Sequence, residues 1–227
     1  MTTDAPLPES DSQLSADTVR LEALSDGVIA VAITLLVLDL KVPHVGEESL
    51  WSALVAQWPV YAAYVTSFLV IGILWVNHHG IFKQIRYSTR GLMMTNLILL
   101  MLIVAIPFVT SLVSDYLLEP GFNAKVAMAT YNALALAIAL AMTALWGFAL
   151  RRPELLEPEV DVAAVRKAFP RFSVGSSVYA VLIVVSFINP LLALAGTFLV
   201  AVYYSFEHLP KAGRTDPDLT STGDASG

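Results

Sequence analysis

The chain has 227 residues, of which 56% are hydrophobic and only 14% are charged, and its formal net charge is −6. Soluble domains carry about 25% charged residues, so this composition argues against a soluble protein and indicates that lipid covers much of its surface. The sequence has no cysteine, which excludes disulfides, thiol catalysis and metal sites built on thiolates. No basic segment with interleaved aromatic residues suggests a nucleic-acid partner.

The two ends of the chain are polar. Residues 1–18 are acidic and lack apolar periodicity, and residues 211–227 are equally poor in large apolar side chains. We expect both segments to be disordered cytoplasmic tails. Because no basic start leads into a short apolar run, we expect no cleavable signal peptide, and the first hydrophobic segment is predicted to be a retained transmembrane helix.

Six apolar segments lie between the tails, within residues 19–210, and each approaches the length of a membrane span, roughly 17–25 residues. They are residues 21–40, 50–77, 92–113, 124–150, 172–188 and 190–206. A charged loop is expected at 151–171, and Asn189-Pro190 is expected to separate the last two helices. If this pair were only a kink, the two helices would form one span of about 35 residues, which is too long. The sequence therefore predicts an all-α polytopic membrane protein with six transmembrane helices.

The positions of lysine and arginine predict the orientation. With the N-terminus inside, the outer face receives only Lys41 and Lys125. The inner face receives the other eleven, which are Arg20, Lys83, Arg86, Arg90, Arg151, Arg152, Arg166, Lys167, Arg171, Lys211 and Arg214. This bias predicts a multi-pass protein of the plasma membrane with both termini in the cytoplasm.

Polar side chains gather at the inner ends of the first two predicted helices. They are Arg20, Ser25, Asp26, Trp75, His78 and His79. An aspartate within a membrane helix costs about 2.5–3.5 kcal/mol on insertion scales unless it is paired or hydrated. We therefore predict that these residues form a structural polar network that joins the two helices. The alternative is that Ser25 or Asp26 caps the helix at the membrane surface, although residues 21–24 already follow a helical pattern.

The 21–40 helix resembles the first helix of the endosomal and lysosomal potassium channel family, the transmembrane protein 175 type, in its prokaryotic members. That family carries an arginine, then Phe-Ser-Asp, then a small and apolar run with a threonine eight residues after the aspartate. Leu24 stands where the family has phenylalanine, and the matching residues are Arg20, Ser25, Asp26 and Thr34. The resemblance continues through later helices, at Ser67-Phe68, Trp75 to His79, Asn96 and Pro107-Phe108.

This resemblance implies an assembly. Prokaryotic members of the family have one six-helix unit per chain and form tetramers, whereas animal members have two units and form dimers. The present sequence has one Ser-Asp helix, so the resemblance implies a homotetramer in the lipid bilayer, with the 21–40 helix of each subunit lining a central pore.

One face of the 21–40 helix is the candidate pore surface. Residues three and four apart share a helix face, which places Val31, Thr34, Leu35 and Leu38 on one stripe. The resemblance makes this stripe the pore and gate, with Val31 at the narrowest apolar ring. The alternative is ordinary helix packing, because small and aliphatic residues fill most interfaces between membrane helices.

The sequence has no Thr-Val-Gly-Tyr-Gly segment, so we expect no carbonyl selectivity filter. The resemblance implies instead an apolar constriction that closes by dewetting, with the permeant potassium ion passing near the hydroxyl of Thr34. Val31 is smaller than the isoleucine or leucine usual at this ring, so we predict a wider or less selective pore. No cofactor is expected.

The remaining polar residues have simpler interpretations. His78 and His79 are adjacent and point in different directions from a helix, so we expect no metal site there. Asp39 lies at the outer end of the first helix, either as a solvated surface charge or as a charge that draws cations to the outer mouth. No phosphate-binding loop, zinc-protease motif or nucleophile elbow is present, so we do not expect an enzyme.

The sequence is thus interpreted as that of a potassium-permeable cation channel. The alternatives are an ion-coupled secondary transporter and a proton leak pathway. Transporters often place broken helices and ionisable residues at the midplane of the membrane, whereas the first helix is unbroken and apolar between Asp26 and Asp39.

Overall fold

The computed structural model describes residues 9–44 and 49–206, and it describes their side chains except at 9–16, 168–175 and 206. These residues contain no β-strand, only an isolated bridge between Ile85 and Leu156, so the predicted all-α class is confirmed. The helices are α1 Glu9–Leu35, η1 Leu36–Asp39, α2 Leu50–Ala56, α3 Trp58–Phe82, α4 Arg90–Ile103, α5 Ile106–Tyr116, α6 Asn123–Leu150, η2 Pro153–Leu155, α7 Val162–Ile188 and α8 Pro190–Phe206.

Four helical segments are long and apolar enough to cross a membrane. They are Asp17–Asp39, Trp58–Phe82, Arg90–Tyr116 and Asn123–Leu150. Two further apolar helical segments, Ser176–Ile188 and Pro190–Ser205, are shorter. Because a bilayer core needs about 20 apolar helical residues per crossing, these segments make the chain a multi-pass membrane protein.

The first helix starts earlier than predicted. α1 begins at Glu9, so residues 9–18, which were expected to be disordered, form its first turns. Apolar periodicity is a poor guide here, because a helix that extends beyond the membrane has no apolar face to maintain. Residues 1–8 and the predicted tail at 211–227 lie outside the described part of the chain.

Two predicted helices are each divided near a proline. The predicted 50–77 helix is two helices, α2 and α3, which meet at Gln57, two residues before Pro59. The predicted 92–113 helix is likewise α4 and α5, which are separated by residues 104–105 just before Pro107. Proline lacks the backbone N–H and its ring clashes with the preceding turn. Each break therefore falls next to a position where a backbone hydrogen bond of the helix cannot form.

The charged loop after α6 is shorter than predicted. α7 begins at Val162, inside the expected loop at 151–171, because the Asp161 carboxylate accepts hydrogen bonds from the backbone N–H groups of Ala163 and Ala164, both at 3.0 Å. These bonds satisfy donors that a helix start leaves unpaired, and they mark Asp161 as the N-cap.

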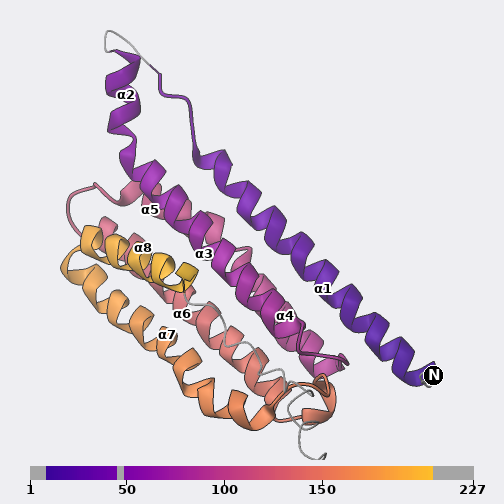
Figure 1. Ribbon diagram of the computed structural model, residues 1–227. Helices are drawn as coiled ribbons and strands as arrows, with labels where there is room; N and C mark the ends of the chain where they lie inside the picture. Colours follow the sequence, from indigo (N-terminus) through magenta and orange to yellow (C-terminus); the bar gives the residue numbers. More distant parts are fainter. Residues whose placement is uncertain (1–8, 45–48, 207–227) are drawn as a thin grey trace, which may run out of the picture.

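Asn189 separates the last two helices, as predicted. α7 ends at Ile188 and α8 begins at Pro190, and the Asn189 side-chain oxygen accepts hydrogen bonds from the N–H groups of Leu191 and Leu192. α8 folds back against α7 (Figure 1) and also packs on α3. The pair is therefore a turn between two helices and not a kink within one.

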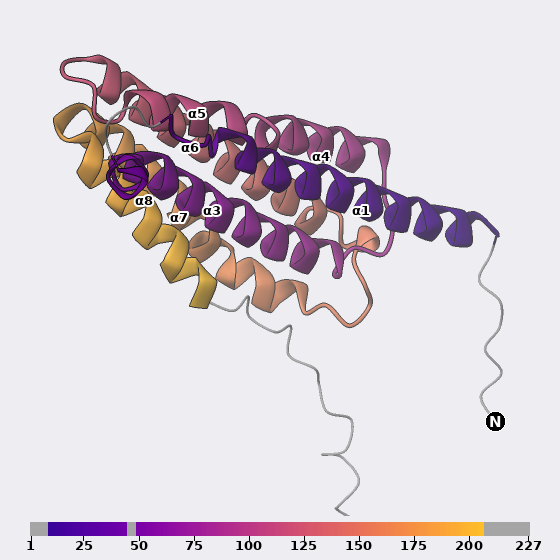
Figure 2. The same ribbon diagram turned by 90° about the horizontal axis from the view of Figure 1, so that it is seen from above.

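The helices form a bundle with α1 at one edge. α1 lies along α3 on one side of the bundle, and α7 and α8 lie at the opposite side (Figures 1 and 2). α1 also contacts α4 and α5, which run along the flank of α1 opposite to α3 (Figure 2). One long face of α1 is consequently left without a neighbour in the single chain.

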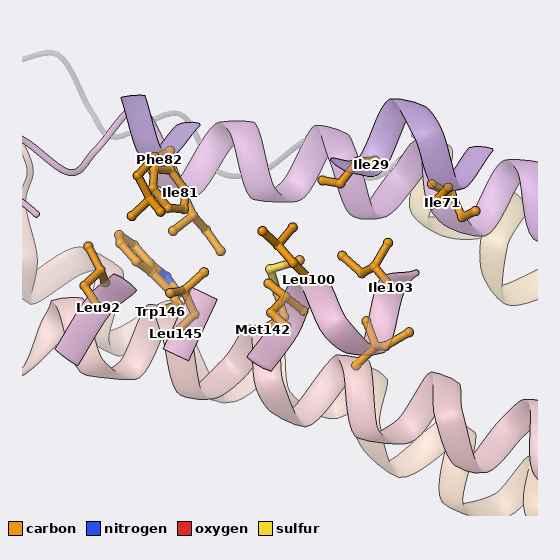
Figure 3. Close-up of a cluster of buried hydrophobic side chains, with 14 of the residues drawn as sticks. Ile29, Ile71, Ile81, Phe82, Leu92, Leu100, Ile103, Met142, Leu145 and Trp146 are labelled. Atoms are coloured by element: carbon orange, nitrogen blue, oxygen red, sulfur yellow. The ribbon is translucent and has the colours of Figure 1, made fainter. Parts of the chain in front are cut away.

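The main hydrophobic core lies between α1, α3, α4 and α6. Figure 3 shows aliphatic and aromatic side chains from these four helices converging. Ile71, Leu92, Ile103 and Leu145 are among its members, and each is fully or almost fully buried. A second, smaller cluster joins α3, α5, α6 and α8 around Met128.

The loops at the N-terminal end of α1 are tied together by hydrogen bonds. The Thr18 hydroxyl donates to the Arg86 carbonyl at 3.3 Å, and the Arg86 N–H donates to the Leu155 carbonyl at 2.8 Å. The Arg166 guanidinium donates to the Leu150 carbonyl at 2.9 Å. The segments that carry most of the lysines and arginines therefore meet at one end of the bundle, which we call the basic end.

Candidate functional site

The four residues predicted to line a pore lie on the uncovered face of α1. Val31 is 56% exposed and Leu38 is 70% exposed, and Thr34 and Leu35 are also exposed. The opposite face is buried, with Ala32 and Leu36 completely enclosed. We call Val31, Thr34, Leu35 and Leu38 the α1 stripe. A large uncovered apolar surface marks a site of contact with lipid or with another chain.

Thr34 is the polar member of the α1 stripe. Its hydroxyl donates to the Val31 carbonyl at 2.9 Å, one turn back in the same helix. A threonine hydroxyl has one donor and two acceptor lone pairs, so this bond uses the donor and leaves the oxygen able to accept. The stripe therefore offers an oxygen ligand between apolar residues.

A buried chain of hydrogen bonds joins α1, α3 and α4 near the basic end. The Asn96 side-chain amide donates to the Ser25 hydroxyl at 2.8 Å, and its oxygen lies 2.8 Å from Nε2 of His78. The Ser25 hydroxyl in turn donates to the Leu21 carbonyl at 2.8 Å. Ser25, His78 and Asn96 are completely buried. An amide both donates and accepts, so Asn96 alone can link the hydroxyl to the imidazole.

A second, more exposed set of contacts joins α1 and α3 beside this chain. The indole Nε1–H of Trp75 donates to Oδ1 of Asp26 at 2.9 Å. His79 Nδ1 lies 2.9 Å from Oε1 of Glu22, and its ring stacks on Trp75 with the centroids 5.7 Å apart. Asp26 is therefore paired, as its cost in a membrane helix requires.

The structure thus brings together five of the six residues of the predicted network and excludes the sixth. Arg20 is 85% exposed, and its guanidinium lies 4.0 Å from Asp17 on the same helix. Within a single chain Arg20 therefore lies apart from the other five residues. Position 20 lies four residues before Leu24 and seven before Gly27, which are also exposed, so this spacing turns Arg20 toward the uncovered face.

Two members of the network were missed as partners by the sequence analysis. Glu22 lies one turn before Asp26 on α1, and this i, i+4 spacing is a signal that the two carboxylates share a face. Asn96 was noted only as part of the family resemblance. A lone amide on an apolar helix gives no indication of its partner, because that depends on which helices pack together.

Asp39 is not a free surface charge. Its Oδ1 accepts a hydrogen bond of 2.7 Å from the hydroxyl of Ser111 on α5, and the side chain is partly buried. Ser111 was not singled out from the sequence. Among the residues that the structure describes, no group of three or more His, Cys, Asp or Glu side chains is arranged to hold a metal ion.

Comparison with known proteins connects this arrangement to one family. The family model for the endosomal/lysosomal potassium channel TMEM175 matches residues 20–107. A potassium channel of Streptomyces collinus is 47% identical over 192 residues, which are 84% of this chain and 93% of that protein. The crystal structure of a lysosomal potassium-selective channel TMEM175 homolog from Chamaesiphon minutus matches with a TM-score of 0.75 and 38% identity, over 84% of this chain and 97% of that one.

The animal relatives are longer proteins. The human endosomal/lysosomal proton channel TMEM175 is 32% identical over 151 residues, which are 62% of this chain but only 30% of the human protein. The bacterial relatives, in contrast, match along almost their whole length, and the Chamaesiphon minutus structure shares the helical bundle described above. From this near-complete coverage we conclude that the chain belongs to the TMEM175 family of endosomal/lysosomal potassium channels.

Proposed function

We propose that this chain forms a potassium-permeable channel as a homotetramer of six-helix subunits, with the α1 stripe of each subunit facing a central pore. The observation that carries the proposal is the exposure of the α1 stripe, which is apolar except for Thr34. The bacterial relatives are named potassium channels, which supports the choice of ion.

The position of α1 in the bundle supports a shared pore. α1 lies at the edge of the subunit and packs on α3, α4 and α5 through one face only. A pore inside one subunit would need polar or hydrated surfaces between its helices, whereas the space between α1, α3, α4 and α6 is filled by the main core. A path for ions is therefore expected outside the subunit, where copies of the α1 stripe meet.

The chemistry of the stripe suggests how ions pass. Four copies of Val31 form an apolar ring that excludes water when narrow, which is a known way of gating. Four Thr34 hydroxyls lie one turn outward and replace part of the hydration shell of a potassium ion. Leu35 and Leu38 continue the apolar wall toward the outer mouth, where Asp39 supplies negative charge.

The proposed topology follows the distribution of charge. In the proposed topology the shorter apolar segments in α7 and α8 are the fifth and sixth spans, because the turn at Asn189 reverses the direction of the chain. Positive residues are retained in the cytoplasm, so the basic end and both termini face the cytoplasm of a plasma membrane.

The test is potassium flux into liposomes that contain the purified full-length chain. Val31→Asn should increase the flux, because a polar ring wets the constriction, and Thr34→Ala should lower it by removing the oxygen ligands. Val184→Asn is the matched control, since Val184 on α7 is 61% exposed but lies away from the stripe. Liposomes without flux, or equal effects of Val31→Asn and Val184→Asn, would refute the proposed pore.

The size of the Val31 side chain gives a second test. If four valines form the narrowest ring, then Val31→Ile should raise the potassium-to-sodium permeability ratio, because a larger side chain narrows the ring. The ratio is measured from reversal potentials in planar bilayers with asymmetric salts. An unchanged or lower ratio, in a variant that still conducts, would place the selective step elsewhere.

Proton conduction is a second candidate, because the animal relatives are named proton channels. A pH-sensitive dye in the same liposomes distinguishes the two ions, since a proton current at zero potassium gradient requires a proton path. The transporter alternative is separated by electrical recording: unitary current steps support a channel, whereas saturable counterflow without steps supports a transporter.

A further inference from the structure

The outermost turn of the α1 stripe is not α-helical. At Leu35 the α-helix gives way to the 3-10 helix η1, Leu36–Asp39, and the backbone angles of Leu35, φ −65° and ψ −25°, are those of a 3-10 turn. The Leu40 N–H donates to the Val37 carbonyl at 3.0 Å, three residues back. The 3-10 hydrogen bonding therefore continues to the C-terminal end of η1.

This tightening changes which side chains share a face. Side chains at i and i+3 eclipse in a 3-10 helix, so the tighter turn brings Val37 closer to the direction of Thr34 around the helix axis. In a continuous α-helix Val37 would be turned by about 60° from Thr34. Val37 is 51% exposed, although the sequence pattern did not place it on the stripe, and Leu36 beside it is completely buried.

A side-chain hydrogen bond from α5 holds this turn at its outer end. The Ser111 hydroxyl lies 2.7 Å from Oδ1 of Asp39 and 3.3 Å from the Pro107 carbonyl in its own helix, so the carboxylate is the nearer acceptor. A 3-10 helix turns by about 120° per residue and an α-helix by about 100°. If η1 became α-helical, Asp39 would rotate by roughly 80° over its four residues, which would break the bond to Ser111.

Building on the proposed pore, we propose that Ser111 is a positioning residue: by holding Asp39, it keeps η1 in the 3-10 form, so that Val37 as well as Leu38 faces the outer part of the pore. Ser111 itself touches no ion. When its hydrogen bond is lost, the turn relaxes toward α-helical geometry. In that geometry Leu38 still points in nearly the same direction from the helix axis as Val31, whereas Val37 rotates away from the pore.

The absence of cysteine from the chain makes the test direct. Val37→Cys and Leu38→Cys each introduce one thiol into the full-length protein in liposomes, and Val31→Cys is the reference for the pore. A cationic methanethiosulfonate reagent is added from outside. The rate of thiol modification and the accompanying loss of potassium flux are then measured.

Each cysteine variant is made in four separate backgrounds: the unchanged chain, Ser111→Ala, Ser111→Thr and Asp39→Asn. With Ser111 present, both outer cysteines should react and block flux. Ser111→Ala should slow modification of Val37→Cys by about two- to tenfold, since the net effect of one hydrogen bond shifts a local equilibrium by up to about that factor, with little change at Leu38→Cys. Ser111→Thr should restore the rate because it keeps the hydroxyl. Asp39→Asn should also keep it, because its amide oxygen accepts the same bond without the charge.

The outcomes separate this inference from the proposed function. If Leu38→Cys reacts and blocks flux while Val37→Cys does not react, the pore stands and the inference is overturned. The inference is also overturned if Val37→Cys is modified at the same rate with Ser111 as with Ser111→Ala. It is likewise overturned if the rate changes in Asp39→Asn but not in Ser111→Ala. If Val31→Cys and Leu38→Cys are both modified without loss of flux, the proposed pore itself fails.

Discussion

Replacing Asn96 with alanine removes the central link of the buried chain that joins α1, α3 and α4. The variant loses the bonds to the Ser25 hydroxyl and to Nε2 of His78, both 2.8 Å long. Ser25 keeps its own bond to the Leu21 carbonyl. The buried imidazole of His78, in contrast, loses the hydrogen-bond partner of its Nε2 atom.

The expected cost follows from these two losses. Hydrogen bonds between membrane helices average about 0.6 kcal/mol each, which puts the lower bound near 1 kcal/mol. A buried donor left without a partner costs about 1–3 kcal/mol. We therefore expect Asn96→Ala to lower the free energy of unfolding by about 1–3 kcal/mol.

The assay is reversible unfolding of the purified protein in mixed micelles with a denaturing detergent, followed by circular dichroism. Thr95→Ala is the matched control on the same helix, because within the described part of the chain the Thr95 hydroxyl bonds to the Gly91 carbonyl one turn back and to no other helix. Its cost should stay within about 0.5 kcal/mol. A double-mutant cycle of Asn96→Ala with His78→Ala should give a coupling energy of at least about 0.5 kcal/mol. Equal costs for Asn96→Ala and Thr95→Ala, or no coupling, would refute the reasoning.

Two further predictions concern packing and capping. Gly91→Ala should destabilise the fold by about 1–3 kcal/mol, because the added Cβ would lie 2.6 Å from Cζ of Phe148. In Gly72→Ala the added Cβ meets no atom within 4 Å, so this control should be neutral or stabilising. Thermal unfolding measures both variants, and an unfolding midpoint for Gly91→Ala at or above that of Gly72→Ala contradicts the packing described. Asp161→Ala should destabilise the start of α7 by about 1 kcal/mol, which is measured as faster amide hydrogen exchange in its first turn. Asp161→Asn should keep the cap. Unchanged exchange in the alanine variant would show that the cap does not stabilise the helix.

The helices could be predicted where apolar length and local chemistry agree. The structure places α6 at Asn123–Leu150, within one residue of the predicted 124–150, and it separates α7 from α8 at Asn189. The divisions at Gln57 and before Pro107 were missed, because a proline within an apolar run is compatible with either a kink or a complete break. The early start of α7 depends on Asp161, a cap that the sequence contains but that was assigned to the loop.

The candidate site was predictable to the extent that it lies on one helix. Helical periodicity placed Val31, Thr34, Leu35 and Leu38 on a common face, and the structure leaves that face uncovered. Periodicity also assumes a uniform helix, so it could not reveal that η1 turns Val37 toward the same side. The polar network was predicted from residue types at the same depth of the membrane, which grouped Asp26 with Trp75, whose indole bonds to it, and also included Arg20, which lies apart in the single chain.

Taken alone, the sequence determined that this chain crosses a membrane several times, that its basic loops share one side, and that one face of its first helix carries a threonine among aliphatic residues. These properties depend on composition and on spacing along a helix, which are local. Only the tertiary structure decided that Asn96 bridges Ser25 and His78, and that Ser111 holds Asp39. Such pairings depend on which helices are neighbours and on how far each is rotated, and no spacing within a single helix contains that information.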